Sequence, residues 1–194
     1  MSSIRHNLNL YGLLFFLVSI NSVAQENPIL DKFSFHSVSL SPVGVFYSEA
    51  EQLNDNSIHA GPAFAGQANF KYKKNLFGIS ATVGTEVDII WSDGANDWFY
   101  EFDVLYGREF NLSKRFYIDV FGGVGLLNKQ FNESVLENGG IESVTYFAVP
   151  LQVKLKPLVT EIFAIGFQLQ ATISSEKPLF MGGLLLQYHR EAKF

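Results

Sequence analysis

Along most of the chain, the hydrophobic pattern has a period of two. Eight segments alternate apolar with polar side chains and are separated by runs rich in turn-forming residues, a pattern typical of strands. Each segment exceeds the roughly five or six residues of a usual soluble strand and meets the roughly 9–11 needed to cross a bilayer at a tilt. We therefore predict an all-β chain, an eight-stranded antiparallel up-and-down β-barrel, with strands at 33–47, 59–73, 76–91, 98–110, 115–127, 144–156, 161–174 and 179–189.

The alternation is clear in the sixth segment, where Phe147 and Leu151 share one face while Gln152 and Lys154 share the other. Two places interrupt the pattern. Pro42 and Gly44 in the first segment indicate a bulge or a bend. Pro150 in the sixth has no N–H group, so it removes one hydrogen bond from the ladder.

The segments between the strands differ in length and in charge. Connections at 48–58, 92–97 and 128–143 are long and polar, whereas those at 74–75, 111–114, 157–160 and 175–178 are short. Lys and Arg gather near the short turns of strands two, four and six, and Asp and Glu gather in the long loops. Outer-membrane barrels have long loops outside the cell and short turns in the periplasm, so we expect this arrangement here, with both termini in the periplasm.

Periodicity alone does not say which face points inward. A soluble lipocalin-like lipid carrier would turn its apolar face toward a ligand, whereas a transmembrane barrel turns it toward lipid. Aromatic residues near both strand ends, matching two interfacial girdles, favour the transmembrane barrel. Charged residues on the polar faces would then fill the lumen, and we expect an ion-pair network there of Glu86, Asp88, Glu101, Asp103, Asp119, Lys71 and Lys154, with Arg108 as a further candidate.

The first residues read as a secretory signal peptide. Arg5 gives a positive start, residues 10–20 form an apolar run, and Ser22-Val23-Ala24 gives a small-x-small cleavage pattern. The run is about 11 residues, too short for a spanning helix of about 20. We predict a signal peptide at 1–24 and a barrel domain at 25–194.

Composition excludes several classes of function. The chain has no cysteine, which removes disulfides, thiol catalysis and Cys-based metal sites. Its 14 Lys and Arg stand against 19 Asp and Glu, a net charge of −5. Without a basic stripe, a nucleic-acid partner is not expected.

The end of the chain carries a resemblance. Gly183, Leu186 and Tyr188 are spaced as Gly-x-x-Leu-x-Tyr, and Phe194 is the last residue. This resembles the signal by which outer-membrane barrels are recognised for assembly, although a tail follows Tyr188. With the strand count and loops, residues 30–194 resemble the eight-stranded barrels of the outer-membrane protein A and X type. The resemblance implies a monomer in the outer membrane of a Gram-negative bacterium, inserted by the barrel-assembly machinery and in contact with outer-membrane lipids and lipopolysaccharide.

Catalytic candidates are few. Some barrels of this size resemble lipid A deacylases and palmitoyltransferases, and His59 with Ser57 and Asp55 could form such a site at the outer rim. The His-x-Ser-Asn motif of the deacylase type is absent, because Ala60-Gly61-Pro62 follows His59.

The other chemical candidates have simpler explanations. His36 and His189 fall at the opposite, periplasmic rim, as neighbours in a closed barrel. The pairs Glu101–Asp103 and Glu86–Asp88 could serve as an acid and base or as metal ligands, but ion pairs in a filled lumen explain them more simply. We predict a non-enzymatic barrel without metal or cofactor, serving envelope integrity, surface interaction or limited passage of small solutes. The alternatives are a lipid A-modifying enzyme and the lipocalin-like carrier.

Overall fold

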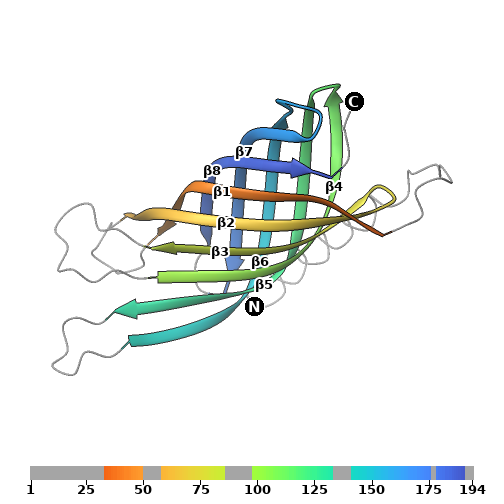
Figure 1. Ribbon diagram of the computed structural model, residues 1–194. Coiled ribbons are helices and arrows are strands. Elements are labelled where there is room, and N and C mark those ends of the chain that lie inside the picture. The colour runs from red at the N-terminus through yellow and green to blue at the C-terminus, as the bar shows by residue number, and fades with distance from the viewer. Residues whose placement is uncertain (1–32, 50–57, 86–97, 133–140, 176–177, 191–194) are drawn as a thin grey trace, which may run out of the picture. The chain divides into compact units, whose positions relative to one another are not determined.

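The computed structural model of the chain describes residues 33–49, 58–85, 98–132, 141–175 and 178–190. Consecutive strands pair antiparallel, and the last strand pairs with the first, so the sheet closes into a barrel (Figure 1). The predicted fold class is confirmed. No helix among the described residues is long and apolar enough to cross a membrane. The strands are β1 (Ser34–Glu49), β2 (Ile58–Tyr72), β3 (Asn75–Thr85), β4 (Trp98–Ser113), β5 (Phe116–Asn132), β6 (Ile141–Pro157), β7 (Phe163–Ser174) and β8 (Leu179–His189).

Two predicted connections are too long. β5 and β6 continue through half of the predicted loop 128–143. Asn128 pairs with Thr145, and their side chains hydrogen-bond at 2.8 Å. β4 likewise runs into the predicted turn 111–114. Polar residues such as Asn and Ser indicate turns in a sequence, but they also fit a strand whose backbone groups are paired. The end of the third predicted strand, 86–91, lies outside the described residues.

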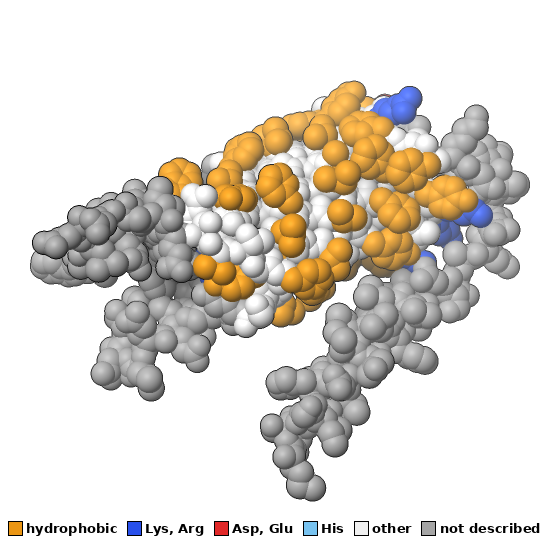
Figure 2. Space-filling view, turned by 90° about the horizontal axis from the view of Figure 1, so that it is seen from below, with side chains coloured by type: hydrophobic (Ala, Val, Ile, Leu, Met, Phe, Trp, Pro, Cys, Tyr) orange, Lys and Arg blue, Asp and Glu red, His pale blue; other side chains and the backbone are white. Residues whose placement is uncertain are grey.

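The two faces of the sheet differ in the way expected of a membrane barrel. On β3, burial alternates residue by residue, with Ser80 and Thr82 inside and Ile79 60 % exposed outside. Figure 2 shows the outward apolar side chains spread over the described barrel wall. Polar side chains inside and apolar ones outside is the reverse of a lipocalin-like carrier.

Aromatic side chains mark the two edges of this apolar surface on β4. Trp98 and Tyr106 are eight positions apart, which is about 27 Å along a strand at roughly 3.4 Å per residue. A tilt of about 40° reduces this to roughly 20 Å along the barrel axis, close to the apolar band of about 25 Å in outer-membrane barrels. Tyr106 also contacts Phe77 on β3, with ring centroids 5.5 Å apart.

The two ends of the barrel are defined by their connections. At the turn end, β2–β3, β4–β5 and β6–β7 are joined through described residues, and β1 begins while β8 ends. At the loop end, strands are joined through 50–57, 86–97, 133–140 and 176–177, which lie outside the described residues. The turn end carries exposed basic side chains, among them Lys73, Lys74, Lys114, Arg115 and Arg190.

Strand β1 is irregular at two positions. Its pairing with β2 shifts between Ser41 and Gly44, which confirms the predicted irregularity near Pro42. A second shift between Phe35 and Ser37 leaves His36 as an extra residue, and this bulge was not predicted. The bulge turns His36 inward, while the Phe35 ring contacts Phe70 edge-on at 6.0 Å.

The predicted effect of Pro150 is also visible. The pairing between β5 and β6 is interrupted at Gly123 and Val124, in the register opposite Val149 and Pro150. On its other side, Pro150 still pairs with Thr172 of β7. The interruption is therefore limited to one side of the strand, and the barrel remains closed.

The outward face of β4 provides a test of the membrane orientation. Phe102, 59 % exposed, lies midway between the two aromatic levels, and Leu112, 62 % exposed, lies at the turn end. We expect Phe102→Arg to reduce the free energy of folding into phospholipid vesicles by about 2–4 kcal/mol, and Leu112→Arg by about 0–1 kcal/mol, because the cost of a cation depends on depth. Urea titration in vesicles measures both. Equal costs for the two variants would contradict this orientation.

Candidate functional site in the barrel lumen

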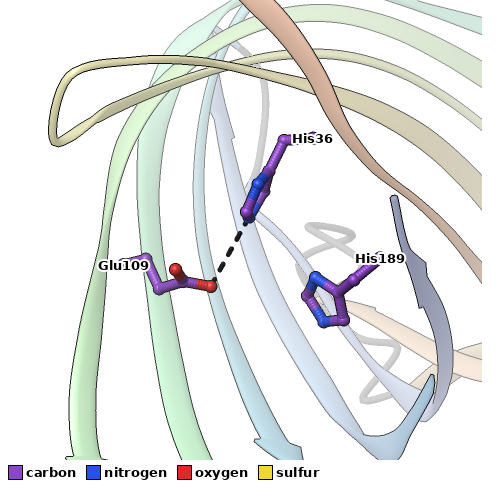
Figure 3. Close-up of side chains that lie close together, drawn as sticks. All are labelled: His36, Glu109 and His189. Atoms are coloured by element: carbon purple, nitrogen blue, oxygen red, sulfur yellow. Dashed lines mark ion pairs between the residues drawn. The ribbon is translucent and has the colours of Figure 1, made fainter. Parts of the chain in front are cut away.

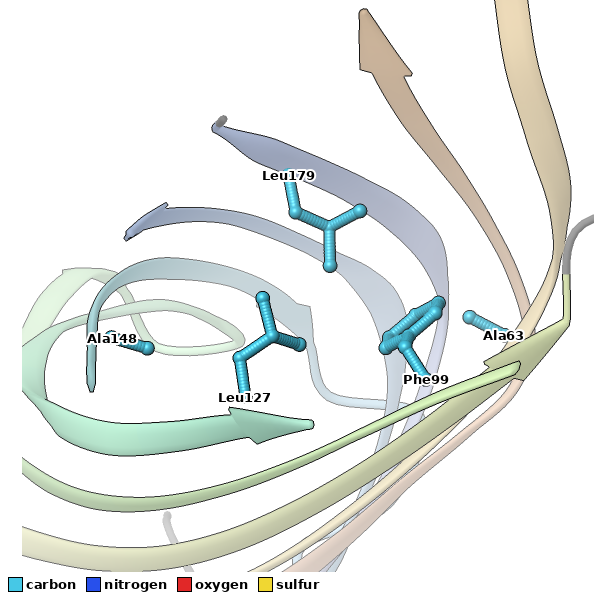
Figure 4. Close-up of a cluster of buried hydrophobic side chains, with 5 residues drawn as sticks. All are labelled: Ala63, Phe99, Leu127, Ala148 and Leu179. Carbon is cyan, nitrogen blue, oxygen red and sulfur yellow. The ribbon is translucent and has the colours of Figure 1, made fainter. Parts of the chain in front are cut away.

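An apolar layer fills the lumen near the loop end. It is formed by side chains that five different strands point inward (Figure 4). The largest is the ring of Phe99, which is 5 % exposed, and Met181 packs against the layer. From the sequence we predicted only polar and small residues in the lumen, so the apolar layer corrects that prediction. Its members are Ala63, Phe99, Leu127, Ala148 and Leu179.

The next layer toward the turn end is polar and acidic. Glu101 is fully buried and accepts hydrogen bonds from Thr172 Oγ1 at 2.8 Å and Gln170 Nε2 at 3.2 Å, across the lumen. Asp103 accepts one from Ser80 Oγ at 2.8 Å. Within the described residues, neither carboxyl group has an ion pair. The donors to this part of the predicted ion-pair network are therefore neutral hydroxyl and amide groups rather than cations.

A second apolar group follows, made of Leu76, Leu105 and Phe121. The fully buried Lys154 passes beside it, with its ammonium 5.7 Å from the centre of the Phe121 ring. Lys154 Nζ donates a hydrogen bond to Ser39 Oγ at 2.7 Å, from the opposite wall. Lys154 thus joins β6 to β1 through the lumen.

Charges pair directly near the turn end. Lys156 is fully buried, with its Nζ 2.6 Å from Asp119 Oδ2 and 2.9 Å from Glu109 Oε2. Lys71 Nζ lies 3.5 Å from the other oxygen of Glu109. His36 Nε2 lies 3.6 Å from Glu109 Oε2, so Lys156, Lys71 and His36 all meet at the Glu109 carboxylate.

The glycine-rich segment of β5 has a steric explanation. A Cβ at Gly125 would collide with the Asp103 carboxyl group, and one at Gly123 would collide with the backbone of Val104. Glycine at these positions lets β4 and β5 approach closely and leaves room for inward side chains.

The predicted network residues are distributed over two levels. Glu101 and Asp103 lie in the acidic layer, while Asp119, Lys71 and Lys154 lie toward the turn end. Glu86 and Asp88 lie outside the described residues. Lys156 and Glu109 were not predicted for the network, although both continue the inward alternation, two positions beyond Lys154 and six beyond Asp103. It could not place His36 in the lumen, because the bulge shifts its face.

The remaining predicted residues lie at the two ends of the barrel. His59 is in β2 at the loop end, paired with Ser48, while Ser57, Asp55 and Phe194 lie outside the described residues. The assembly signal residues Gly183, Leu186 and Tyr188 lie in β8, where they pair with Gly44, Leu40 and Val38 of the first strand.

The buried cation at the turn end provides a test of lumen energetics. Lys156→Ala leaves two carboxylates without their shared partner in a buried site, so we expect a loss of about 3–5 kcal/mol in folding free energy. Lys114→Ala, an exposed lysine at the same end, should change it by less than about 0.5 kcal/mol. Urea titration in vesicles again gives both values. A loss below 1 kcal/mol (roughly the value of an exposed pair) for Lys156→Ala would mean that the cluster is solvated.

No protein-family model matches the chain, and no curated protein matches its sequence. Solved structures do match its fold. Neisserial surface protein A (NspA) superposes with a TM-score of 0.57 at 11% identity, over 82% of this chain and 97% of that one. Ail, the attachment invasion locus protein of Yersinia pestis, solved with the heparin analogue sucrose octasulfate, superposes with a TM-score of 0.54 at 13% identity, over 80% and 98%. The chain therefore has the fold of the small eight-stranded outer-membrane barrels.

Proposed function

We propose that this chain is a monomeric outer-membrane barrel with a closed lumen, which acts through its wall and its loops rather than as a pore or an enzyme. The observation that carries the proposal is the apolar layer around Phe99 and Leu127 at the loop end of the lumen. Water and ions do not pass readily through a layer of packed apolar side chains. Eight strands also leave an interior just wide enough for side chains to fill.

One small cavity lies in the described part of the lumen. A cavity of about 20 Å³, lined by Thr82, Gln168 and Gln170 among others, has room for about one water molecule. It lies between strands that also contribute to the acidic layer. Of the three predicted roles, the structure therefore supports envelope integrity and surface interaction better than limited passage of small solutes.

The proposed location and partners follow from the fold and the sequence together. The predicted signal peptide, residues 1–24, would direct export, and the barrel-assembly machinery would insert the chain. The outward apolar face would contact outer-membrane lipids and lipopolysaccharide. The basic turn end would then face the periplasm, and the loop end the cell surface.

The loop segments suggest the chemistry of a surface partner. Residues 50–57, 86–97 and 133–140 contain eight Asp and Glu and no Lys or Arg. Like charges repel, so a sulfated glycan, the class represented by the heparin analogue in the Ail structure, is a poor candidate here. A cationic surface, or divalent cations shared with lipopolysaccharide phosphates, fits this composition better.

Conductance tests the closed lumen. We expect the folded chain in a planar lipid bilayer to give no sustained current, because apolar side chains close the loop end of the lumen. A large porin, whose wider barrel leaves an aqueous channel, is the positive control. Steady openings of the wild-type barrel, at a level that does not vary between preparations, would contradict a closed lumen.

Complementation separates the envelope role from lipid A chemistry. Cells lacking the gene are expected to become more sensitive to detergent, and both the wild type and His59→Ala should restore resistance, since neither role nor fold requires that histidine. Mass spectrometry of lipid A should show one acyl pattern in all strains. The opposite result has two parts: folded His59→Ala protein in the outer-membrane fraction fails to restore resistance, and the acyl pattern of lipid A changes with the gene. Together these results would favour a lipid A-modifying enzyme.

A further inference from the structure

Three potential metal ligands meet at the turn end of the lumen. They are His36 on β1, Glu109 on β4 and His189, the last residue of β8 (Figure 3). One ligand atom from each lies within 4.8 Å of the other two. The two imidazole rings are 5.5 Å apart between centroids, at an angle of 70°. We propose that this cluster, His36–Glu109–His189, binds a divalent transition metal ion such as Zn²⁺.

The backbone fixes two of these ligands beside one another. The bulge in β1 places His36 and Ser37 successively inside the barrel, and Ser37 pairs with His189 across the β1–β8 seam. Arg190 N donates to His36 O at 3.0 Å, which continues the ladder past both histidines. Bulges commonly redirect a side chain beside a functional site. Here the bulge creates a pair of histidines that a regular strand would separate onto opposite faces.

Glu109 reaches the pair from the opposite wall. The His189 side chain is fully buried, and the side chains of His36 and Glu109 are 10% and 9% exposed. The site is therefore largely buried, and only His36 and Glu109 keep a small exposed fraction. Three protein ligands with one open position is a known zinc arrangement, in which water completes the tetrahedron.

The distances suit a small ion after slight adjustment. Zn–N and Zn–O bonds of about 2.1 Å place tetrahedral ligand atoms about 3.4 Å apart. His36 Nε2 and Glu109 Oε2 are already 3.6 Å apart. Separations of up to 4.8 Å in the cluster must shorten to about 3.4 Å when the ion binds. Two imidazoles and one carboxylate favour Zn²⁺ and its first-row neighbours over Ca²⁺ or Mg²⁺, which prefer oxygen ligands.

The neighbouring lysines compete with the metal for Glu109. Lys156 keeps a second carboxylate, since its Nζ is 2.6 Å from Asp119 Oδ2, so it retains an ion pair when Glu109 binds a cation. Lys71 is one-third exposed and can move into solvent. Removing the charge of Lys71 should therefore strengthen metal binding, a change that a merely structural cluster would not produce.

Zinc titration of the folded, untagged barrel in detergent micelles tests the site. We expect about one high-affinity Zn²⁺ per chain, a loss of at least about tenfold in affinity for His36→Ala and His189→Ala, and a gain of about fivefold for Lys71→Ala. His59→Ala, at the loop end, is the matched histidine control and should bind like the wild type. Heat-modifiable migration on a gel confirms that each variant is folded.

The visible spectrum of bound Co²⁺ gives a second readout, which needs no ligand variant. Bound to two imidazoles, a carboxylate and water, it should show the visible absorption of a tetrahedral site, and Zn²⁺ but not excess Mg²⁺ should remove it. The proposal would be overturned if the wild type, His36→Ala and His189→Ala bound zinc with equal affinity. It would also be overturned if the wild type bound zinc with a dissociation constant above about 1 mM. Loss of the Co²⁺ spectrum in His59→Ala would overturn it as well.

Discussion

Closure of the hydrogen-bond ladder between β1 and β8 is the constraint on which the rest of the structure depends. An open sheet would leave unpaired N–H and C=O groups facing hydrocarbon, each at a cost of several kcal/mol. The register from Ser37 with His189 to Ser48 with Leu179 removes both edges. Closure also fixes the strand number and therefore the diameter of the lumen. The irregularities of β1 are tolerated because its two neighbours continue the ladder on either side of each shift.

A narrow lumen then determines what its inward side chains do. They touch one another across the barrel, so some polar groups find their partners on the opposite wall rather than on a neighbouring strand. Lys154 reaches Ser39 and Glu101 reaches Thr172 in this way. The apolar group of Leu76, Leu105 and Phe121 separates the acidic layer from the charged turn end. The result is a filled interior that joins opposite strands.

The proposed function follows from this division of the molecule. A filled lumen directs the proposed role to the surface, where the wall would meet lipid and the loops would meet the exterior. The turn end is chemically different, since it combines basic side chains with the cluster His36–Glu109–His189 beside the closing seam. A metal ion bound there would connect the first and last strands to the opposite wall, so its binding and the closure of the barrel would reinforce each other.

The sequence alone determined the fold class, the number of strands and, on most strands, which side chains face inward, because a period of two is a local property of an extended chain. Glu101, Asp103 and Lys154 were placed in the lumen on this basis. Tertiary structure decided what local pattern does not contain. Pairing extended β5 and β6 through polar residues such as Asn128. Packing filled the loop end of the lumen with Phe99 and its neighbours. The partners of Glu101 are neutral side chains rather than a lysine. Tertiary structure also turned His36 inward, because a bulge depends on pairing with a neighbouring strand. Contacts across a closed barrel join residues far apart in the chain, and no spacing within one strand specifies them.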